Sequence, residues 1–130
     1  MSKNKKILIV DDELDIVTYF EALFQDGGYD TITAFNGEQG FEIAKSEKPD
    51  LITLDITMPV QSGVRTYCQY KIDITLKNTP VIIITAADDS MSSFLEKLNG
   101  ITGPEGFVNK PVDPEKLLQK VAALLSVKIN

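Results

Sequence analysis

Carboxylates dominate the residues of this sequence that could do chemistry. Asp11, Asp12 and Glu13 follow one short apolar run, and Asp55 follows a second. Carboxylates that lie close together repel one another, so a cluster of them needs a cation. Ligands that are all oxygen favour a hard divalent ion such as Mg²⁺ or Mn²⁺. An aspartate can also act as a nucleophile and form an acyl phosphate.

Two further polar residues, Thr85 and Lys110, each follow a later apolar run. A lysine ammonium suits a phosphoryl oxygen as a point charge, and a threonine hydroxyl can donate to another. Each residue alone has an ordinary interpretation: an aspartate can cap a helix or begin a turn, a threonine can bond to nearby backbone, and a lysine can be solvated. Their joint occurrence after successive apolar runs favours a phosphoryl-transfer site.

The elements that must position these residues alternate along the chain. The apolar runs are continuous, which is typical of parallel strands buried on both faces, and segments with helical periodicity separate them. We predict strands over Ile7–Val10, Thr31–Phe35, Leu51–Leu54, Val81–Ile84 and Gly106–Asn109. We predict helices over Leu14–Phe24, Glu38–Lys45, Val64–Leu76, Ser90–Leu98 and Glu115–Val127, the last capped by Asp113-Pro114.

This alternation predicts an α/β fold, a single doubly wound five-stranded parallel sheet with five helices on two faces. Ligands of such sheets bind beyond the carboxyl ends of the strands, where the predicted site residues lie. We expect one domain over residues 1–130, with a core at about 6–127 and no output domain in this chain.

Composition excludes several classes of function. The chain has no histidine, which excludes Ser-His-Asp and Cys-His catalysis, histidine metal sites and a phosphohistidine carrier. The single cysteine, Cys68, excludes internal disulfides and fits a cytoplasmic protein. The net charge of −6 argues against direct nucleic-acid binding. No apolar run is long enough for membrane insertion.

The motifs, in this order, resemble the response-regulator receiver domain, the phospho-acceptor module of two-component signalling. The resemblance extends from about Lys6 to Val127. It is carried by four motifs: Ile7-Leu8-Ile9-Val10-Asp11-Asp12-Glu13; Leu51-Ile52-Thr53-Leu54-Asp55-Ile56-Thr57-Met58-Pro59 with Gly63; Pro80-Val81-Ile82-Ile83-Ile84-Thr85-Ala86; and Phe107-Val108-Asn109-Lys110-Pro111.

The resemblance implies a metal site and a phosphorylation site. Asp55 would accept the phosphoryl group from a sensor histidine kinase. Asp12 would bind Mg²⁺ directly, Asp11 would hold a coordinated water, and Thr57 would offer its backbone carbonyl to the metal. Asp55 would also contact the metal. Lys110 would pair first with Asp55 and then with the phosphoryl group.

The resemblance also implies a switch and a strand order. Thr85 would follow the phosphoryl group inward, and Phe107 would occupy the aromatic switch position. The sheet would have the order 2-1-3-4-5, with a cis peptide bond at Lys110-Pro111. Phosphorylation would shift the face formed by the fourth helix, fifth strand and fifth helix, where an unknown downstream partner binds. The protein would not be an enzyme beyond its own phosphoryl transfer and slow self-hydrolysis.

One segment departs from the family. The chain is longer than usual over residues 99–106, where glycine and proline replace an alanine-rich segment. This segment borders the predicted output face, so the family's usual partner geometry cannot be assumed there. An ordinary surface-loop insertion explains the extra residues equally well.

Several alternatives compete with a phosphorylated receiver. A haloacid-dehalogenase-like phosphatase would need a second acid two residues after Asp55, where this chain has Thr57. A flavodoxin-like cofactor carrier would need a phosphate loop after the first strand, where this chain has three acids. A receiver that binds partners without phosphorylation, or one that passes its phosphoryl group onward as a phosphorelay intermediate, remains open.

Overall fold

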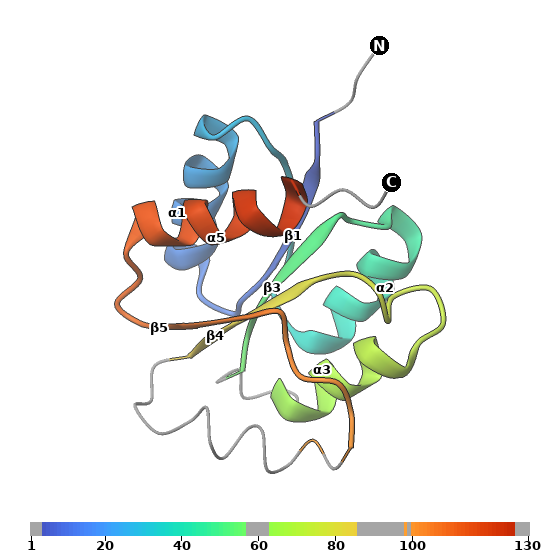
Figure 1. Ribbon diagram of the computed structural model, residues 1–130. Coiled ribbons are helices and arrows are strands. Elements are labelled where there is room, and N and C mark those ends of the chain that lie inside the picture. Colours follow the sequence, from blue (N-terminus) through green and yellow to red (C-terminus); the bar gives the residue numbers. More distant parts are fainter. Residues whose placement is uncertain (1–3, 57–62, 86–97, 99, 127–130) are drawn as a thin grey trace.

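One parallel sheet organises the computed structural model, which describes residues 4–56, 63–85, 98 and 100–126 (Figure 1). Its strands run in the order β2-β1-β3-β4-β5, and each neighbouring pair is parallel. This confirms the predicted fold class and strand order. The strands are β1 (Lys6–Val10), β2 (Asp30–Ala34), β3 (Leu51–Asp55), β4 (Val81–Thr85) and β5 (Gly106–Asn109).

Helices cover both faces of the sheet. Figure 1 shows α1 and α5 on one face and α2 and α3 on the other. The predicted helix over Ser90–Leu98 lies outside the described residues except for Leu98. The described helices are α1 (Leu14–Asp26), α2 (Gly37–Glu47), α3 (Gly63–Ile72) and α5 (Pro114–Ser126).

The prediction of one helix over Val64–Leu76 was wrong at its C-terminal end. The helix ends at Ile72, and turns follow it. The Asp73 carboxylate accepts hydrogen bonds from the backbone N–H and the hydroxyl of Thr75, at 2.8 and 2.6 Å. These local bonds compete with helical hydrogen bonds, which explains the early end.

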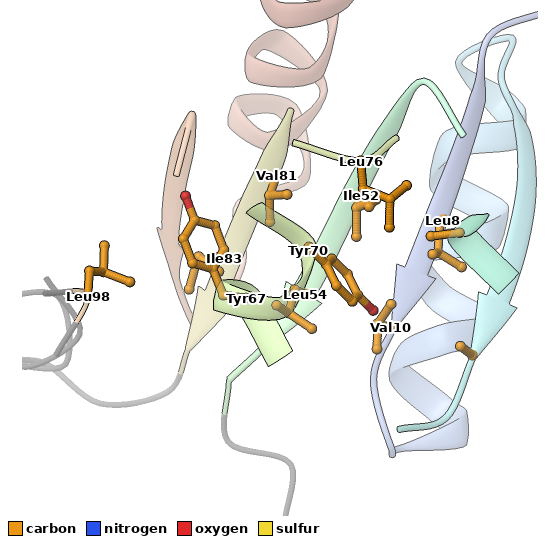
Figure 2. Close-up of a cluster of buried hydrophobic side chains, with 12 residues drawn as sticks. Leu8, Val10, Ile52, Leu54, Tyr67, Tyr70, Leu76, Val81, Ile83 and Leu98 are labelled. Atoms are coloured by element: carbon orange, nitrogen blue, oxygen red, sulfur yellow. The ribbon is translucent and has the colours of Figure 1, made fainter. Parts of the chain in front are cut away.

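Alternating side chains of each central strand enter two separate cores, because successive residues of a strand point to opposite faces. Figure 2 shows the core on the α2 and α3 face, where the rings of Tyr67 and Tyr70 lie against strand residues. The strand residues there are Leu8, Val10, Ala34, Ile52, Leu54, Val81 and Ile83. The opposite core joins Ile7, Ile9, Leu51, Ile82 and Ile84 to Val17, Phe20, Phe24, Leu117 and Val121.

The strand register brings the predicted site residues to one edge. Val10 pairs with Leu54, so Asp11 and Asp55 each follow the same rung of the sheet. Asp55 lies opposite Ile84, one residue before Thr85. Helices cover both faces of these strands. The polar side chains at the strand ends can therefore reach solvent only at the carboxyl edge of the sheet.

The chain before β5 is tied to α3 and to the start of β4. The Lys71 ammonium, with a side chain only 2% exposed, donates to both carboxylate oxygens of Glu105 at 3.0 Å. Glu105 also accepts the backbone N–H of Val81 at 2.8 Å, and the Tyr67 hydroxyl donates to the Thr102 carbonyl at 2.6 Å. The described part of the longer segment is therefore anchored to the body of the fold.

Helix α5 begins as the sequence predicts. Asp113 accepts hydrogen bonds from the backbone N–H groups of Glu115 and Lys116 at 3.0 and 3.3 Å, and Pro114 is the first helical residue. None of the helices in the described ranges has the length and apolar character needed to span a bilayer.

Candidate functional site

Asp55 and Lys110 form an ion pair at the carboxyl edge of the sheet. The Lys110 Nζ lies 3.2 Å from Asp55 Oδ2, and the Asp55 side chain is only 2% exposed. The same ammonium lies 3.7 Å from Glu13 Oε1 and 3.9 Å from Asp11 Oδ2. Lys110 therefore contacts three carboxylates, and only Asp55 lies at hydrogen-bonding distance.

Asp11 is the buried carboxylate beside this pair. Its Oδ1 accepts the backbone N–H of Glu13 at 2.9 Å, whereas its buried Oδ2 has no hydrogen-bond partner among the described residues. Burial raises the pKa of Asp11 to about 6, and the negative charge of Asp55 adds to the effect. The Glu13 N–H and the Lys110 charge lower this pKa, but less than burial raises it.

The carboxylates of this edge fit a divalent cation. One oxygen from each of Asp11, Asp12, Glu13 and Asp55 lies within 4.8 Å of the others. Lys110 is the only ammonium paired with this cluster in the described residues, so up to four negative charges face one positive charge. Asp11 Oδ2, which accepts no hydrogen bond from the described residues, and the all-oxygen donor set suit a hard cation such as Mg²⁺.

Lys110 keeps its positive charge at this edge. Burial alone would lower the pKa of Lys110, but the carboxylates of Asp55, Asp11 and Glu13 raise it above its ordinary value. Its backbone N–H donates to the Thr85 carbonyl at 2.7 Å, which ties the end of β5 to the end of β4. The Lys110-Pro111 peptide bond is cis, as predicted.

Thr85 and Phe107 lie on the two strands at the other side of Asp55. Thr85 is fully buried at the end of β4, next along from the residue opposite Asp55. Phe107 pairs with Ile83, is half-buried and packs against the core on the α2 and α3 face. Both residues therefore lie where a change at Asp55 could be transmitted across two strands.

The structure brings together most of the predicted site residues. Asp11, Asp12, Asp55 and Lys110 meet at one edge, and Thr85 ends the strand beside Asp55. Thr57, predicted to offer its carbonyl to the metal, lies outside the described residues. The sequence analysis counted Glu13 among the clustered acids but gave it no individual role, and the structure places it beside Lys110. The signal for it was its position directly after the acid pair.

A groove lies beside this site on the surface of β5 and α5. It has a volume of about 310 Å³, and Phe107 is one of its walls. The other residues that line it are Val108, Asn109, Pro111, Asp113, Lys116, Leu117 and Lys120. Phe107, the predicted switch residue, is therefore partly exposed in this groove.

Comparison with known proteins gives a consistent family assignment. Residues 7–122 match the family model described as response regulator receiver domain. Protein PilH of Pseudomonas aeruginosa is 34% identical over 93% of this chain and 98% of its own length. The alkaline phosphatase synthesis transcriptional regulatory protein PhoP of Bacillus subtilis is 37% identical, and this chain spans about half (49%) of its length.

Solved structures agree with these sequence relatives. The chemotaxis response regulator CheY4 of Vibrio cholerae is 27% identical, with a TM-score of 0.83 over 95% of this chain and 100% of that chain. The family match covers both the strands and the polar residues that follow them. The chain therefore belongs to the response regulator receiver domain family of two-component systems.

Proposed function

We propose that Asp55 accepts a phosphoryl group from a sensor histidine kinase in a Mg²⁺-dependent reaction. The observation that carries the proposal is the ion pair between the buried Asp55 and Lys110, 3.2 Å apart, beside the buried Asp11 Oδ2, which has no hydrogen-bond partner in the described part of the chain. A nucleophilic carboxylate, a cation for the phosphoryl oxygens and a place for a divalent ion are the parts that this transfer requires.

The proposed reaction makes an acyl phosphate. A carboxylate oxygen of Asp55 attacks the phosphorus of a phosphohistidine, a P–O bond forms and the P–N bond breaks. The electron pair of that bond leaves with the imidazole nitrogen of the kinase, which takes up a proton from solvent. The Lys110 ammonium neutralises charge on the transferred oxygens and stays protonated throughout.

Asp11, Asp12 and Asp55 would hold the magnesium ion. When bound, the ion supplies positive charge that offsets the phosphoryl oxygens. Asp11 and Asp55 are held by the ends of buried strands, so their positions are set before a ligand arrives. Asp12 is exposed and can reach the ion from the solvent side.

Phosphorylation is proposed to change the surface of β5 and α5. A phosphoryl group adds up to about two negative charges and three acceptor oxygens next to Lys110. Thr85 and Lys110 gain new acceptors, and Phe107 lies on β5 two residues before Asn109, which pairs with Thr85. The groove that Phe107 lines is the proposed binding face for a downstream partner.

The receiver is proposed to catalyse only its own phosphoryl transfer and slow self-hydrolysis. The curated relatives include a transcriptional regulatory protein twice the length of this chain and a relative of its own length. A cytoplasmic location and the absence of direct nucleic-acid binding stay predictions.

The intact mass of the protein tests the proposal. The protein is incubated with acetyl phosphate with and without Mg²⁺, beside an Asp55→Ala variant. We expect an adduct of one phosphoryl group that needs Mg²⁺ and is absent from the variant. An adduct that persists in Asp55→Ala contradicts the proposed function. So does the absence of any adduct, with acetyl phosphate and with a panel of histidine kinases, in protein that calorimetry shows to bind Mg²⁺.

A further inference from the structure

Glu13 is the one acidic side chain of the cluster to which neither the motif nor the proposed reaction gives a role. It occupies the position before the first turn of α1, yet its side chain makes no capping hydrogen bond to the helix. Its Oε1 lies instead 3.7 Å from Lys110 Nζ. The Glu13 carboxylate therefore adds its negative charge to the surroundings of Lys110 and does not cap the helix.

The burial of the three carboxylates around Lys110 differs in a way that separates their roles. Asp11 and Asp55 have side chains 2% exposed, whereas Glu13 is 63% exposed. Asp55 and Asp11 therefore approach Lys110 from the interior, and Glu13 approaches from the solvent side. Any ligand that enters from solvent meets the charge of Glu13 close to Lys110.

The interior of the site contains an independent sign that a cation belongs there. Asp11 Oδ2 is buried without a hydrogen-bond partner in the described residues, and a Glu13 carboxylate oxygen lies within 4.8 Å of an oxygen of Asp11. A negative charge at this distance attracts a divalent cation placed among the carboxylates. It also repels an anion that approaches Lys110, because one charge cannot favour both ligands.

We propose that Glu13 sets the balance between cation and anion at this site, raising the affinity for Mg²⁺ and slowing the reaction with anionic phosphoryl donors. The inference rests on the proposed function of Asp55. Glu13 acts as a positioning residue here, because it acts through Lys110 and through the charge of the site. The step it modifies is the approach of the donor, and no bond forms to Glu13.

A Glu13→Gln variant tests this with two ligands of opposite charge. The side chain is mostly exposed, and glutamine keeps its size, so the fold is retained. Isothermal titration calorimetry with MgCl₂ is expected to give a dissociation constant about three- to tenfold higher in the variant. The second-order rate constant for phosphorylation by acetyl phosphate, at saturating Mg²⁺, is expected to rise about two- to fivefold.

Asp26→Asn is the matched control. Asp26 is an exposed acid at the opposite end of the same helix, so the variant changes the net charge equally. We expect the dissociation constant and the rate constant of this variant to stay within about twofold of wild type, because its charge is distant from the site and screened by salt. Both effects of Glu13→Gln should shrink when ionic strength rises, which a loss of packing would not produce.

The outcomes separate this inference from the proposed function. Opposite changes for Mg²⁺ and acetyl phosphate, larger than in Asp26→Asn, support the role of Glu13. Changes of the same direction, or none beyond the control, overturn it even when Asp55 is phosphorylated normally. If wild type takes no phosphoryl group, the proposed function fails, and the calorimetric comparison alone decides whether Glu13 contributes to cation binding.

Discussion

Asp11 illustrates, at the scale of one residue, how burial prepares a carboxylate for a cation. Its pKa is raised from 3.8 to about 6, mainly by burial. The folded protein therefore holds this proton more tightly than the unfolded chain does. The charged carboxylate destabilises the folded state fully above pH about 6, and the effect disappears as pH falls below about 4.

Replacing Asp11 with asparagine should stabilise the metal-free protein at pH 7.5. The pKa shift corresponds to about 3 kcal/mol, and solvent screening at the open edge reduces the expected gain to about 1–2 kcal/mol. Urea unfolding in EDTA at pH 7.5 and pH 4 measures it, and the gain should vanish at pH 4. A loss of stability at both pH values would show that the carboxylate is instead a structural acceptor.

At the scale of elements, the ties between α3 and the segment before β5 distinguish a buried ion pair from a surface pair. Lys71 is 2% exposed and bonds to Glu105 and to the Thr79 carbonyl. The pair between Lys45 and Asp73 has a similar distance of 3.1 Å, but Lys45 is 45% exposed. The two pairs therefore differ at the ammonium, which is buried only in Lys71, whereas the Asp73 side chain is 11% exposed and the Glu105 side chain 32%.

Lys71→Met should lower the free energy of unfolding by about 1–3 kcal/mol, because it removes the hydrogen bonds that the buried ammonium donates to the Thr79 carbonyl and to Glu105. Lys45→Met, the matched control, should change it by less than about 1 kcal/mol. Urea unfolding of both variants with fluorescence of the tyrosines gives the comparison. Equal effects of the two substitutions would contradict the assignment of Lys71 as an anchor of this segment.

Close packing of α2 against the sheet and α3 supplies a second prediction at this scale. A Cβ on Gly40 would lie 3.0 Å from Val10 Cγ2 and would clash with the Tyr70 hydroxyl. Gly40→Ala should therefore lower the free energy of unfolding by about 1–3 kcal/mol, despite the better helix propensity of alanine. Glu42→Ala, which changes an exposed residue of the same helix, should leave the free energy of unfolding nearly unchanged. A Gly40→Ala variant more stable than wild type would contradict this prediction, because it would show that the helix can move away from its neighbours with little loss of stability.

For the whole molecule, Mg²⁺ binding and folding are linked through the carboxyl edge. A ligand that binds only the folded state raises its stability by RT ln(1 + [L]/Kd). Protonation of Asp11 competes with Mg²⁺ below pH about 6. The increase in Tm produced by Mg²⁺ should therefore be clearly smaller at pH 5 than at pH 7.5, with apparent affinity roughly tenfold lower at one unit below the pKa.

Thermal unfolding over a MgCl₂ series at the two pH values measures this linkage. In Asp11→Asn the pH dependence of the Mg²⁺ effect should be much weaker, because the group that takes up the proton is missing. NaCl added at equal ionic strength separates specific binding from general salt screening. A Tm increase that is identical at pH 5 and pH 7.5 would contradict a role for Asp11 at the cation site.

The sequence by itself determined the sheet and the identity of most site residues. A continuous apolar strand such as Val81–Ile84 has apolar side chains on both of its faces. Burying both faces requires helices on each side of the sheet. Polar residues that follow such runs must gather at one edge, so Asp11, Asp55 and Lys110 were predictable as neighbours. These conclusions depend on periodicity and chain order, which are local properties of the sequence.

Tertiary structure alone decided the electrostatics within that edge. Glu13 lies near Lys110 although 97 positions separate them in the chain, and Lys71 pairs with Glu105 from another segment. In the described residues, only one of the two Asp11 oxygens is buried without a hydrogen-bond partner. No local pattern encodes those distances. They arise because packed strands and helices bring distant side chains into one low-dielectric region, where burial determines which charges require a partner.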